Sequence, residues 1–264
     1  MTQLEDSAAS GSGPPPEGAA DAREEIRAYW DVDATTYDLS PHHRPRSSAE
    51  QAAWAATLAR VLPPAPARVL DVGAGTGFLS MLAAGLGHDV TAHDLSPGML
   101  ARLAEKAEAA GLEVTISEGA AEEPPAGPFD AVIERHLLWT LRDPEGTLAA
   151  WRRVAPSGRL VVFEGLWGAG GGAGEAFRSR LRQRVRRLRR EPPDHHGSYD
   201  PSVREQLPLG TGTPPEAVVE LVEAAGWPGV RLERLADVEW ATRRSLPWPE
   251  RSLGVTPRFL VAAG

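Results

Sequence analysis

The stretch from Arg68 to Leu95, RVLDVGAGTGFLSMLAAGLGHDVTAHDL, decides the fold of this chain. In it, an apolar run is followed by glycines at alternate positions, an amphipathic segment and a second apolar run that ends in Asp94. This order predicts a strand, a tight glycine turn, a helix and a second strand, which together form the first βαβ unit of a nucleotide-binding α/β sheet. Glycines let the backbone approach a ligand that a Cβ atom would push away. A carboxylate that ends the second strand can accept hydrogen bonds from ribose hydroxyl groups.

The spacing of the glycines separates two classes of cofactor. A dinucleotide fingerprint has glycines at its first, third and sixth positions. Here the sixth position is Phe78, and the extra glycine falls one place earlier, at Gly77. With Asp71 before the turn, the pattern reads D-x-G-x-G-x-G and is followed by an acid after the second strand. This pattern resembles the class I S-adenosylmethionine-dependent methyltransferases more than the nicotinamide enzymes.

Later segments repeat this resemblance in the same order. Residues 94–100, DLSPGML, resemble the family's acid followed by S-P-x-M-L, and residues 119–125 resemble its G-D-A-E-x-L-P loop. Residues 129–133, FDAVI, are similar to the fourth strand of the family, and residues 158–164, GRLVVFE, to the fifth. The resemblance covers roughly residues 25–264. It is closest to the small-molecule branch, which includes quinone C-methyltransferases and natural-product tailoring enzymes.

Hydrophobic periodicity predicts the elements along the chain. We expect strands at residues 68–73, 89–94, 113–117, 129–134, 159–164, 230–237 and 258–263. We expect helices at residues 22–38, 47–62, 76–86, 97–110, 144–154 and 214–225. Alternation of this kind predicts an α/β fold with a doubly wound, mostly parallel seven-stranded sheet, the Rossmann-like methyltransferase fold. The resemblance implies an antiparallel edge.

The chain is expected to form a single methyltransferase domain, at residues 23–264, after a disordered tail at residues 1–22. Residues 23–64 would form helices of an N-terminal cap. Residues 165–213, after the fifth strand, are too long for a structureless connection and are expected to form a helical lid. Within the lid, residues 177–190 place apolar side chains on one helical stripe and eight arginines on the other faces. This helix is either a solvated surface over the active site or a surface for an anionic substrate or RNA.

The resemblance implies S-adenosylmethionine as the cofactor. The backbone of Gly73 and Gly75 would pass under its methionine portion, and Asp94 would bind the ribose. At the adenine, this chain has Ala120 where the family usually has an aspartate, so the N–H group of Ala121 and either water or Glu122 are left to bind the ring. The expected cofactor-binding residues are Tyr37, Asp71, Gly73, Gly75, Gly77, Asp94, Leu95, Ala120, Ala121, Glu134 and Arg135.

Methyl transfer from a sulfonium needs a positioned acceptor, and it needs a base only where the acceptor must lose a proton. His136 and Glu164 follow or end strands at the expected rim and are the candidate catalytic residues. Each of the other polar and aromatic residues of the rim could bind the substrate, or could instead serve only in packing or lie on the surface. The substrate candidates are Trp30, His42, His43, Trp139, Trp167, His195, His196 and Tyr199.

Composition limits the class of protein. The chain has 264 residues, a formal net charge of −8 and no cysteine, which excludes disulfides, cysteine zinc sites and a thiol nucleophile. No run approaches the roughly 18 apolar residues of a membrane span, and the N-terminus lacks a signal-peptide core. We therefore expect a cytoplasmic enzyme, monomeric or homodimeric, that binds a small-molecule acceptor but no nucleic acid, membrane or metal.

Four functions compete at this point. The first is transfer of a methyl group to an N or O atom of a small polar metabolite in secondary metabolism, such as an aminosugar or aminoglycoside. The second is a quinone-type C-methyltransferase, which would need a more apolar lid. The third is a non-catalytic cofactor-binding protein, suggested only by Ala120. A nicotinamide oxidoreductase is the fourth.

Overall fold

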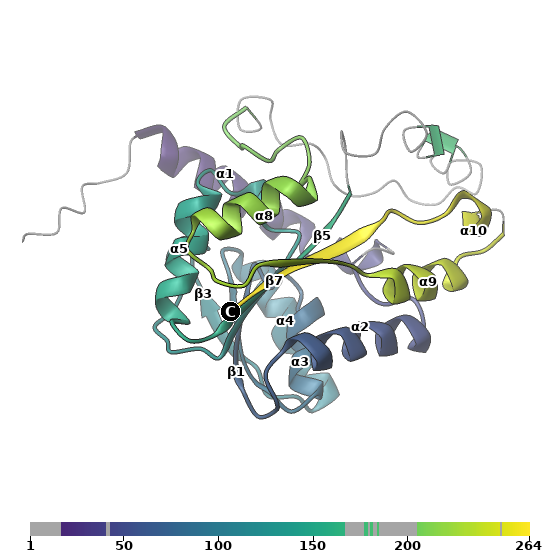
Figure 1. Cartoon of the computed structure of the whole chain (residues 1–264), viewed down its shortest axis with the longest axis horizontal. Coiled ribbons are helices and arrows are strands. Elements are labelled where there is room, and N and C mark those ends of the chain that lie inside the picture. The colour runs from purple at the N-terminus through teal and green to yellow at the C-terminus, as the bar shows by residue number, and fades with distance from the viewer. Residues whose placement is uncertain are drawn as a thin grey trace, which may run out of the picture.

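The computed structural model describes residues 17–40, 43–166, 177, 178, 180, 181, 184, 205–248 and 250–264, with side chains from residue 23 onward. The described strands form one seven-stranded sheet in the order β3-β2-β1-β4-β5-β7-β6 (Figure 1). The strands are β1 (Arg68–Val72), β2 (Asp89–Asp94), β3 (Thr115–Glu118), β4 (Ala131–Arg135), β5 (Arg159–Gly165), β6 (Arg231–Arg234) and β7 (Arg258–Ala263).

All neighbouring strands from β3 to β5 pair in parallel, and β7 runs antiparallel to both β5 and β6. The expected doubly wound, mostly parallel sheet is therefore confirmed. The chain moves outward from β1 to β3 and then returns to β4 on the other side of β1. This reversal places a crevice at the carboxyl ends of β1 and β4, where ligands bind in open α/β sheets.

Some helices begin where the sequence supplies a side-chain cap. The Ser96 side chain accepts the N–H group of Met99 at the start of α4, and Asp143 accepts that of Gly146 at the start of α5. A proline follows each of these caps at the first helical position. The helices are α1 (Glu17–Asp33), α2 (Ser48–Val61), α3 (Phe78–Gly85), α4 (Pro97–Ala110), α5 (Pro144–Val154), α8 (Pro215–Ala224), α9 (Ala236–Ser245) and α10 (Glu250–Leu253), with short 3-10 turns η1 (Tyr37–Leu39) and η2 (Leu138–Thr140).

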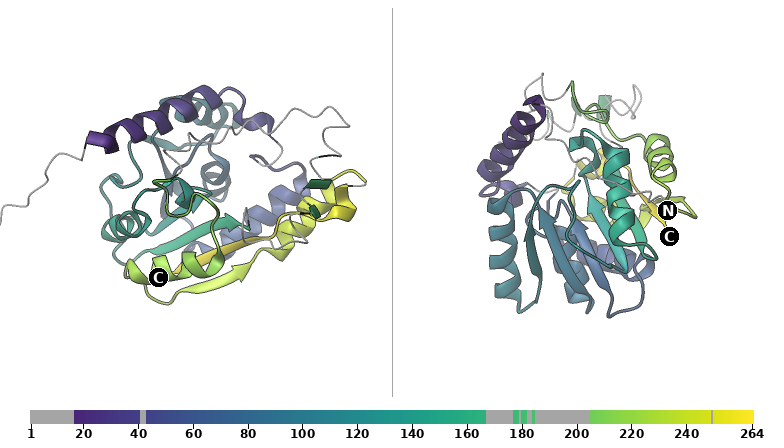
Figure 2. Two further views of the ribbon diagram at one scale, coloured as in Figure 1. Left: turned by 90° about the horizontal axis from the view of Figure 1, so that it is seen from above. Right: turned by 90° about the vertical axis from the view of Figure 1, so that its left-hand side faces the viewer.

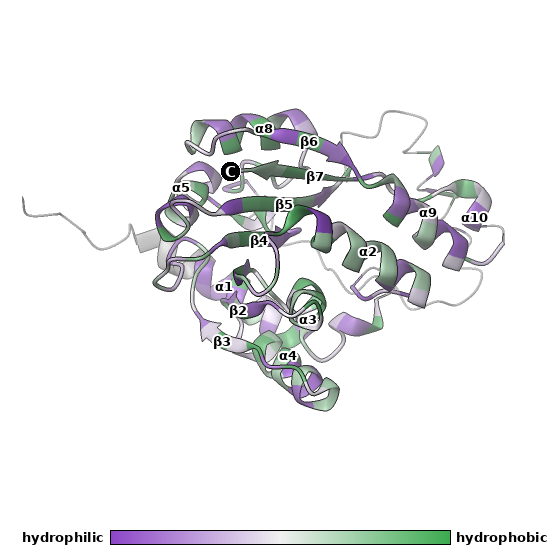
Figure 3. Ribbon diagram, turned by 60° about the horizontal axis from the view of Figure 1, so that its bottom comes forward, coloured by the Kyte–Doolittle hydropathy of each residue, from purple (hydrophilic) through white to green (hydrophobic). Residues whose placement is uncertain are grey.

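Apolar side chains cover both faces of the sheet. Trp151 of α5 and Val218 of α8 pack against one face, and Trp54 of α2 and Leu79 of α3 pack against the other. Strands covered on both sides are apolar throughout rather than alternating, and residues 160–163 of β5 are all almost completely buried. Figure 3 shows the central strands β4, β5 and β7 largely in hydrophobic colours, while the outer helices carry hydrophilic stretches.

The largest differences from the expected bounds lie in two elements. The strand expected at 230–237 ends at Arg234, and α9 begins two residues later. Val238 and Ala241 are buried one helical turn apart, and Thr242 donates its hydroxyl to Glu50 of α2, so tertiary packing favours a helix here. At the other end of the chain, α1 begins at residue 17, inside the expected tail, and ends at residue 33.

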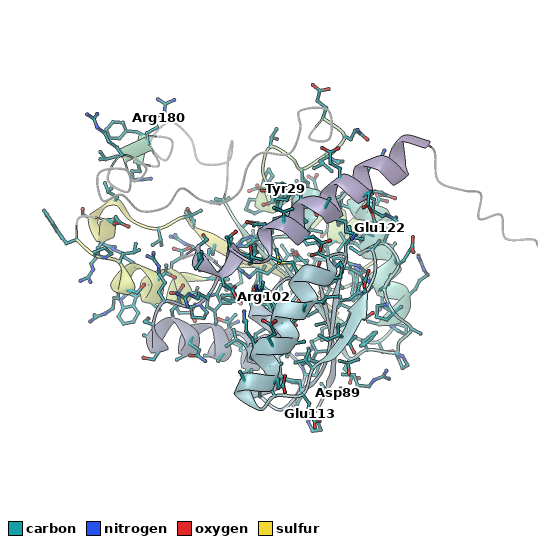
Figure 4. The ribbon with its side chains drawn as sticks, turned by 180° about the vertical axis from the view of Figure 1, so that it is seen from behind. Tyr29, Asp89, Arg102, Glu113, Glu122 and Arg180 are labelled. Atoms are coloured by element: carbon teal, nitrogen blue, oxygen red, sulfur yellow. The ribbon has the colours of Figure 1, made fainter. Side chains whose placement is uncertain are left out.

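Helix α1 lies across the carboxyl ends of the strands as a cap, as Figure 2 shows. Asp31 of α1 accepts hydrogen bonds from the Ser96 hydroxyl at 2.5 Å and the Gly98 N–H group at 3.0 Å, at the start of α4. In Figure 4, Tyr29 and Glu122 lie on the cap side, whereas Asp89 and Glu113 mark the opposite end of the sheet. The cap is therefore fixed above the crevice by polar contacts to the sheet domain.

The expected lid falls only partly within the described residues. Residues 177, 178, 180, 181 and 184 are helical, and Phe177 and Leu181 of the expected apolar stripe are exposed. Figure 4 shows Arg180 on the far side of the molecule from Glu122. The returning segment does reach the cap, because Leu207 is buried against Tyr29 and Trp30.

Candidate active site

A cavity of about 430 Å³ opens at the carboxyl ends of the strands, beneath α1. Pockets of this size hold small ligands. Ten of the expected site residues line it: Trp30, Tyr37, Gly73, Gly75, Asp94, Leu95, Ala120, Ala121, Arg135 and His136. Six others are described but do not line it: His43, Asp71, Gly77, Glu134, Trp139 and Glu164. The remaining candidates, His42, Trp167, His195, His196 and Tyr199, lie outside the described residues.

Gly75 forms an open cradle at the end of β1. Its φ is +53°, a conformation that L side chains rarely adopt, and a Cβ atom added there would meet no other atom within 4 Å. The space that a side chain would fill is thus left to the cavity. A ligand can approach the main chain at this point, so the glycine loop fits the cofactor that the family resemblance implies.

Asp94 ends β2 at the wall of the same cavity. Its carboxylate accepts the N–H groups of Gly75 and Ser96, both at 2.8 Å, which fixes its orientation. Burial raises its pKa from the ordinary value, although the two backbone hydrogen bonds oppose this shift. Each carboxylate oxygen can accept more than one hydrogen bond. The geometry therefore suits a carboxylate that accepts ribose hydroxyl groups.

Two residues of the glycine motif are structural. Gly77 begins α3 at a φ of +87°, and a Cβ atom there would lie 2.6 Å from Cγ of Leu103 on α4, so its glycine is required by helix packing. Asp71 is buried and accepts the hydroxyl of Ser80 on α3 at 2.5 Å. Burial raises its pKa to about 7. These two residues hold the strand, turn and helix together and do not reach the cavity.

Aromatic rings close the cavity beneath the cap. Trp30 and Tyr37 meet edge to face with ring centroids 6.0 Å apart, and the imidazole of His43 stacks on Tyr37 at 3.7 Å. His43 Nδ1 lies 2.6 Å from the carbonyl oxygen of Tyr37. Burial raises the pKa of Tyr37 to about 12, so its hydroxyl keeps its proton. His43 therefore supports Tyr37 from behind rather than lining the cavity.

His136 follows β4 and lines the same cavity. Its Nδ1 lies 3.1 Å from Oε2 of Glu164, the last residue but one of β5, whose side chain is completely buried. The hydroxyl of Thr213 donates to the same oxygen at 3.2 Å. The φ of His136 is +62°, and no other non-glycine residue in the described ranges has a positive φ. Such conformations are costly and concentrate at functional sites.

A cluster of carboxyl groups surrounds one cation behind His136. The guanidinium of Arg135 lies 3.9 Å above the ring of Phe78, and burial lowers its pKa. Burial raises the pKa of Glu164 to about 8, and burial together with the charge of Glu164 raises that of Glu134 well above its ordinary value. Oε1 of each glutamate is buried without a hydrogen-bond partner among the described residues. Burial therefore raises the pKa of both glutamates, and the nearby cation of Arg135 opposes that shift.

Trp139 packs away from the cavity. It contacts the apolar cluster around Leu207 and the core beneath α5. The short 3-10 turn η2 carries Leu138 into the core and Thr140 toward the cavity. Trp139, between them, is directed to the cap segment instead, so in this structure it is a packing residue.

Several lining residues were not expected from the sequence. Arg23 and Ile26 share a face of α1 with Trp30, because positions three and four residues apart lie above one another on a helix. This spacing was a signal that could have identified them. His93 directly precedes the expected ribose carboxylate, and its position could also have indicated a role. Other unexpected lining residues are Met99, Gly119, Leu137, Thr140, Leu141, Arg142, Asp143 and Gln206.

In the described part of the chain, no group of three or more His, Asp or Glu side chains is arranged to hold a metal ion. No helix among the described residues combines the length and apolarity needed to cross a membrane.

Comparison with known proteins agrees with the site. A family model described as a methyltransferase domain matches residues 70–163. A demethylmenaquinone methyltransferase of Thermus thermophilus is 36% identical over 178 residues, which cover 65% of this chain and 78% of that protein. A ubiquinone biosynthesis O-methyltransferase of Xanthomonas axonopodis pv. citri is 39% identical over 107 residues, which cover 38% of this chain and 44% of that protein.

Solved structures share the fold. Phosphoethanolamine N-methyltransferase 2 of Haemonchus contortus, in complex with phosphomonomethylethanolamine and S-adenosylhomocysteine, superposes with a TM-score of 0.59 at 19% identity. The match covers 92% of this chain and 59% of that one, so this chain spans about three fifths of the longer enzyme. The glycine cradle, the carboxylate after β2 and the extensive match to the Thermus enzyme agree with one another. The chain is an enzyme that belongs to the class I S-adenosylmethionine-dependent methyltransferases.

Proposed function

We propose that the enzyme transfers the methyl group to an N or O atom of a small polar metabolite, with His136 as the general base. The contact between His136 Nδ1 and the buried Glu164 carboxyl carries this proposal. When bound, S-adenosylmethionine supplies an electrophilic methyl group. The residues of the chain must then hold the acceptor, exclude water and take up any proton that the acceptor loses.

The Glu164 carboxylate selects the tautomer of His136. When Glu164 is ionised, Nδ1 of the ring donates its hydrogen to the carboxylate, and Nε2 carries the lone pair that can accept a proton. The hydroxyl of Thr213 holds the same carboxylate oxygen and lowers the pKa of Glu164, against the larger effect of burial. His136 lines the cavity with 22% of its side chain exposed, so a bound acceptor can reach it.

The polarity of the cavity rim supports a small polar acceptor. Arg142, Asp143 and Gln206 line the cavity together with Glu122. An acceptor with a long apolar tail would leave these groups desolvated and poorly paired, which is costly. Hydroxyl, amine and carboxyl groups on the acceptor could instead pair with them. The expected aminosugar is one member of this class.

A labelled-methyl screen tests this proposal. The enzyme is incubated with labelled S-adenosylmethionine and separate pools of amines, sugars, phenols and reduced quinones. Label transfer to N or O atoms of a polar pool, lost in His136→Ala, is the expected result. Transfer to carbon of a quinone ring, with all polar pools unlabelled, would contradict it.

Quinone C-methylation is the second candidate, because the Thermus relative is a demethylmenaquinone methyltransferase. The same base could remove the phenolic proton of a reduced quinone. The tail of such a substrate would have to leave the cavity past Ile26 and Trp30, the apolar side chains that α1 contributes to the lining. The quinone pool of the screen decides between the two candidates.

The lid stays part of the proposal. Gln206 lines the cavity and Leu207 packs on the cap, which supports a covering role for the end of the 165–213 segment. The expected place in secondary metabolism, cytoplasmic location and monomeric or homodimeric state stay predictions.

A further inference from the structure

His93 joins two walls of the cavity. It is the last residue but one of β2, and 2% of it is exposed. Its carbonyl oxygen accepts the N–H groups of Gly73 at 2.8 Å and Ala74 at 3.2 Å, in the glycine loop after β1. Its side chain extends the other way, toward the loop after β3. One residue thus contacts both stretches of main chain that line the cofactor end of the cavity.

The imidazole of His93 is held at both nitrogens. Nε2 lies 3.0 Å from the carbonyl oxygen of Ala120, and Nδ1 lies 3.0 Å from the hydroxyl oxygen of Ser117 on β3. A carbonyl oxygen can only accept, so Nε2 carries the hydrogen of this contact. In the neutral ring, Nδ1 then accepts the hydroxyl hydrogen of Ser117.

The ring also lies close to the loop backbone at Gly119. A Cβ atom at Gly119 would lie 2.7 Å from Cε1 of His93, so only glycine leaves room for the imidazole. The N–H group of Gly119 donates to the carbonyl oxygen of Asp94 at 3.0 Å, and Trp151 donates to that of Ala121 at 2.8 Å. The loop at residues 119–121 is therefore held at each of its three residues.

A fixed loop matters because this chain has no carboxylate at position 120. The buried methyl group of Ala120 cannot accept a hydrogen bond from the amino group of a purine. Recognition of the base then depends on main-chain groups of the loop and on Glu122, which follows it and lines the cavity, and the conformation of the loop sets the directions of these groups. Main-chain groups discriminate between ligands only where their positions are held.

We infer that His93 is a positioning residue for the purine end of the cofactor: its hydrogen bond to the carbonyl oxygen of Ala120 fixes the loop that reads the base. It does not touch the reacting atoms. It acts through the backbone of the loop and, through its own carbonyl oxygen, on the glycine loop as well. The inference rests on the family and its cofactor and not on the identity of the acceptor.

Calorimetry with two ligands tests this role. S-adenosylhomocysteine and S-inosylhomocysteine differ only at the purine, where the second carries an oxo group in place of the amino group. His93→Phe keeps a flat ring but removes the donor, and we expect about fivefold weaker binding of S-adenosylhomocysteine, the loss of about one hydrogen bond. The preference for adenine over hypoxanthine should also fall by about threefold or more. His93→Gln is the matched control, because its amide can donate to the same carbonyl oxygen, and it should restore most of the affinity and the preference.

Loss of a purely structural contact would lower the affinities for both ligands by the same factor. An unchanged ratio of the two affinities in His93→Phe, or an unchanged affinity for S-adenosylhomocysteine, would therefore overturn the inference. If His93→Phe does not fold, Ser117→Ala decides, since it removes the hydrogen bond that holds Nδ1 and leaves the ring freer to turn away from Ala120. If Ser117→Ala lowers the preference for adenine over hypoxanthine, by less than His93→Phe is expected to, the role of His93 is supported. If Ser117→Ala keeps the wild-type ratio of the two affinities, the role is contradicted. None of these measurements needs an acceptor, so they fail or succeed independently of the proposed function.

Discussion

The two ends of the cavity are formed by different kinds of group. At the cofactor end, the groups that can bind the ligand are main-chain groups and one carboxylate. That carboxylate, Asp94, accepts the N–H group of Gly75, only 19 residues earlier in the chain. At the acceptor end, side chains meet from separate elements. His136 follows β4, Glu164 is the last residue but one of β5, and Thr213, which bonds Glu164, lies 49 residues further along the chain.

This difference has a physical consequence. A ligand bound by main-chain groups at strand ends depends on the sheet, whose central strands are buried. An acceptor read by side chains depends on how distant segments pack, and these segments can change without disturbing the sheet. Cofactor affinity and methyl-transfer rate should therefore respond to different substitutions.

The largest effect is expected from His136→Ala. Removal of a general base typically lowers the rate by about 10²- to 10⁴-fold, and the affinity for S-adenosylhomocysteine should stay within about twofold. The initial rate with an acceptor found in the screen, measured from pH 6 to 9, checks this. His88→Ala, at the amino end of β2, is the matched control and should keep the wild-type rate. A fully active His136→Ala enzyme would show that His136 is not the general base.

The next effect is on the cofactor alone. Asp94→Ala removes charge-assisted hydrogen bonds worth about 1.5–3 kcal/mol each, so the Kd for S-adenosylhomocysteine should rise about tenfold or more. Asp89→Ala, at the start of the same strand, should bind like the wild type. Calorimetry measures both. Unchanged affinity in Asp94→Ala would show that the ribose is held elsewhere.

The two glycines at the ends of the turn should separate binding from stability. Both Gly75→Ala and Gly77→Ala force alanine into a left-handed conformation, which costs about 1–2 kcal/mol. Only Gly77→Ala also drives a Cβ atom against Leu103, so it should lower the free energy of unfolding further. Gly75→Ala should instead lose the larger part of the cofactor affinity, because its Cβ fills the cradle. Equal losses of both quantities in the two variants would contradict this division.

A smaller effect concerns pH and the acceptor end. The pKa of Glu164 is raised from 4.5 to about 8, so between these values the folded chain keeps a proton that the unfolded chain has lost. Stability from this group is therefore fully present below pH 4.5 and is lost as the pH rises through about 8. Glu164→Gln should flatten this fall and raise the Tm at pH 9 relative to the wild type by about 2–4 °C. Glu108 is exposed, so Glu108→Gln is the control and should keep the wild-type slope of Tm against pH. If Glu164→Gln also kept that slope, the Glu164 carboxyl would not titrate in this pH range.

The cofactor end was also the part that the sequence predicted best, for a local reason. The glycine spacing, Asp94 and the cap at Ser96 lie in one continuous stretch, and the order of residues in such a stretch fixes where they meet. Strands β2 and β7 and helices α4 and α5 have the expected bounds because caps and apolar runs mark them. The glycine pattern did not reveal which of its members face a ligand, since Gly77 serves the packing of α4.

The acceptor end could be predicted only in part. A strand end indicates the right edge of the sheet but not the direction of a side chain. Glu164 lies at that edge, but it is buried behind His136 and does not line the cavity, which was not foreseen. Trp139 was separated from the cavity by the turn of η2. Helix α9 was missed because the apolar residues around Leu235 read as a strand, while the contact of Thr242 with Glu50 lies 192 residues apart in sequence.

The most direct test of the division between the two ends is a calorimetric cycle with S-adenosylhomocysteine on the wild type, Asp94→Ala, His136→Ala and the double variant. We expect a rise in Kd of about tenfold or more from Asp94→Ala and a change within about twofold from His136→Ala. The free-energy change of the double variant should equal the sum of the two single changes within about 0.5 kcal/mol. A loss of cofactor affinity in His136→Ala as large as that in Asp94→Ala would show that the two ends act as one site and would contradict this division.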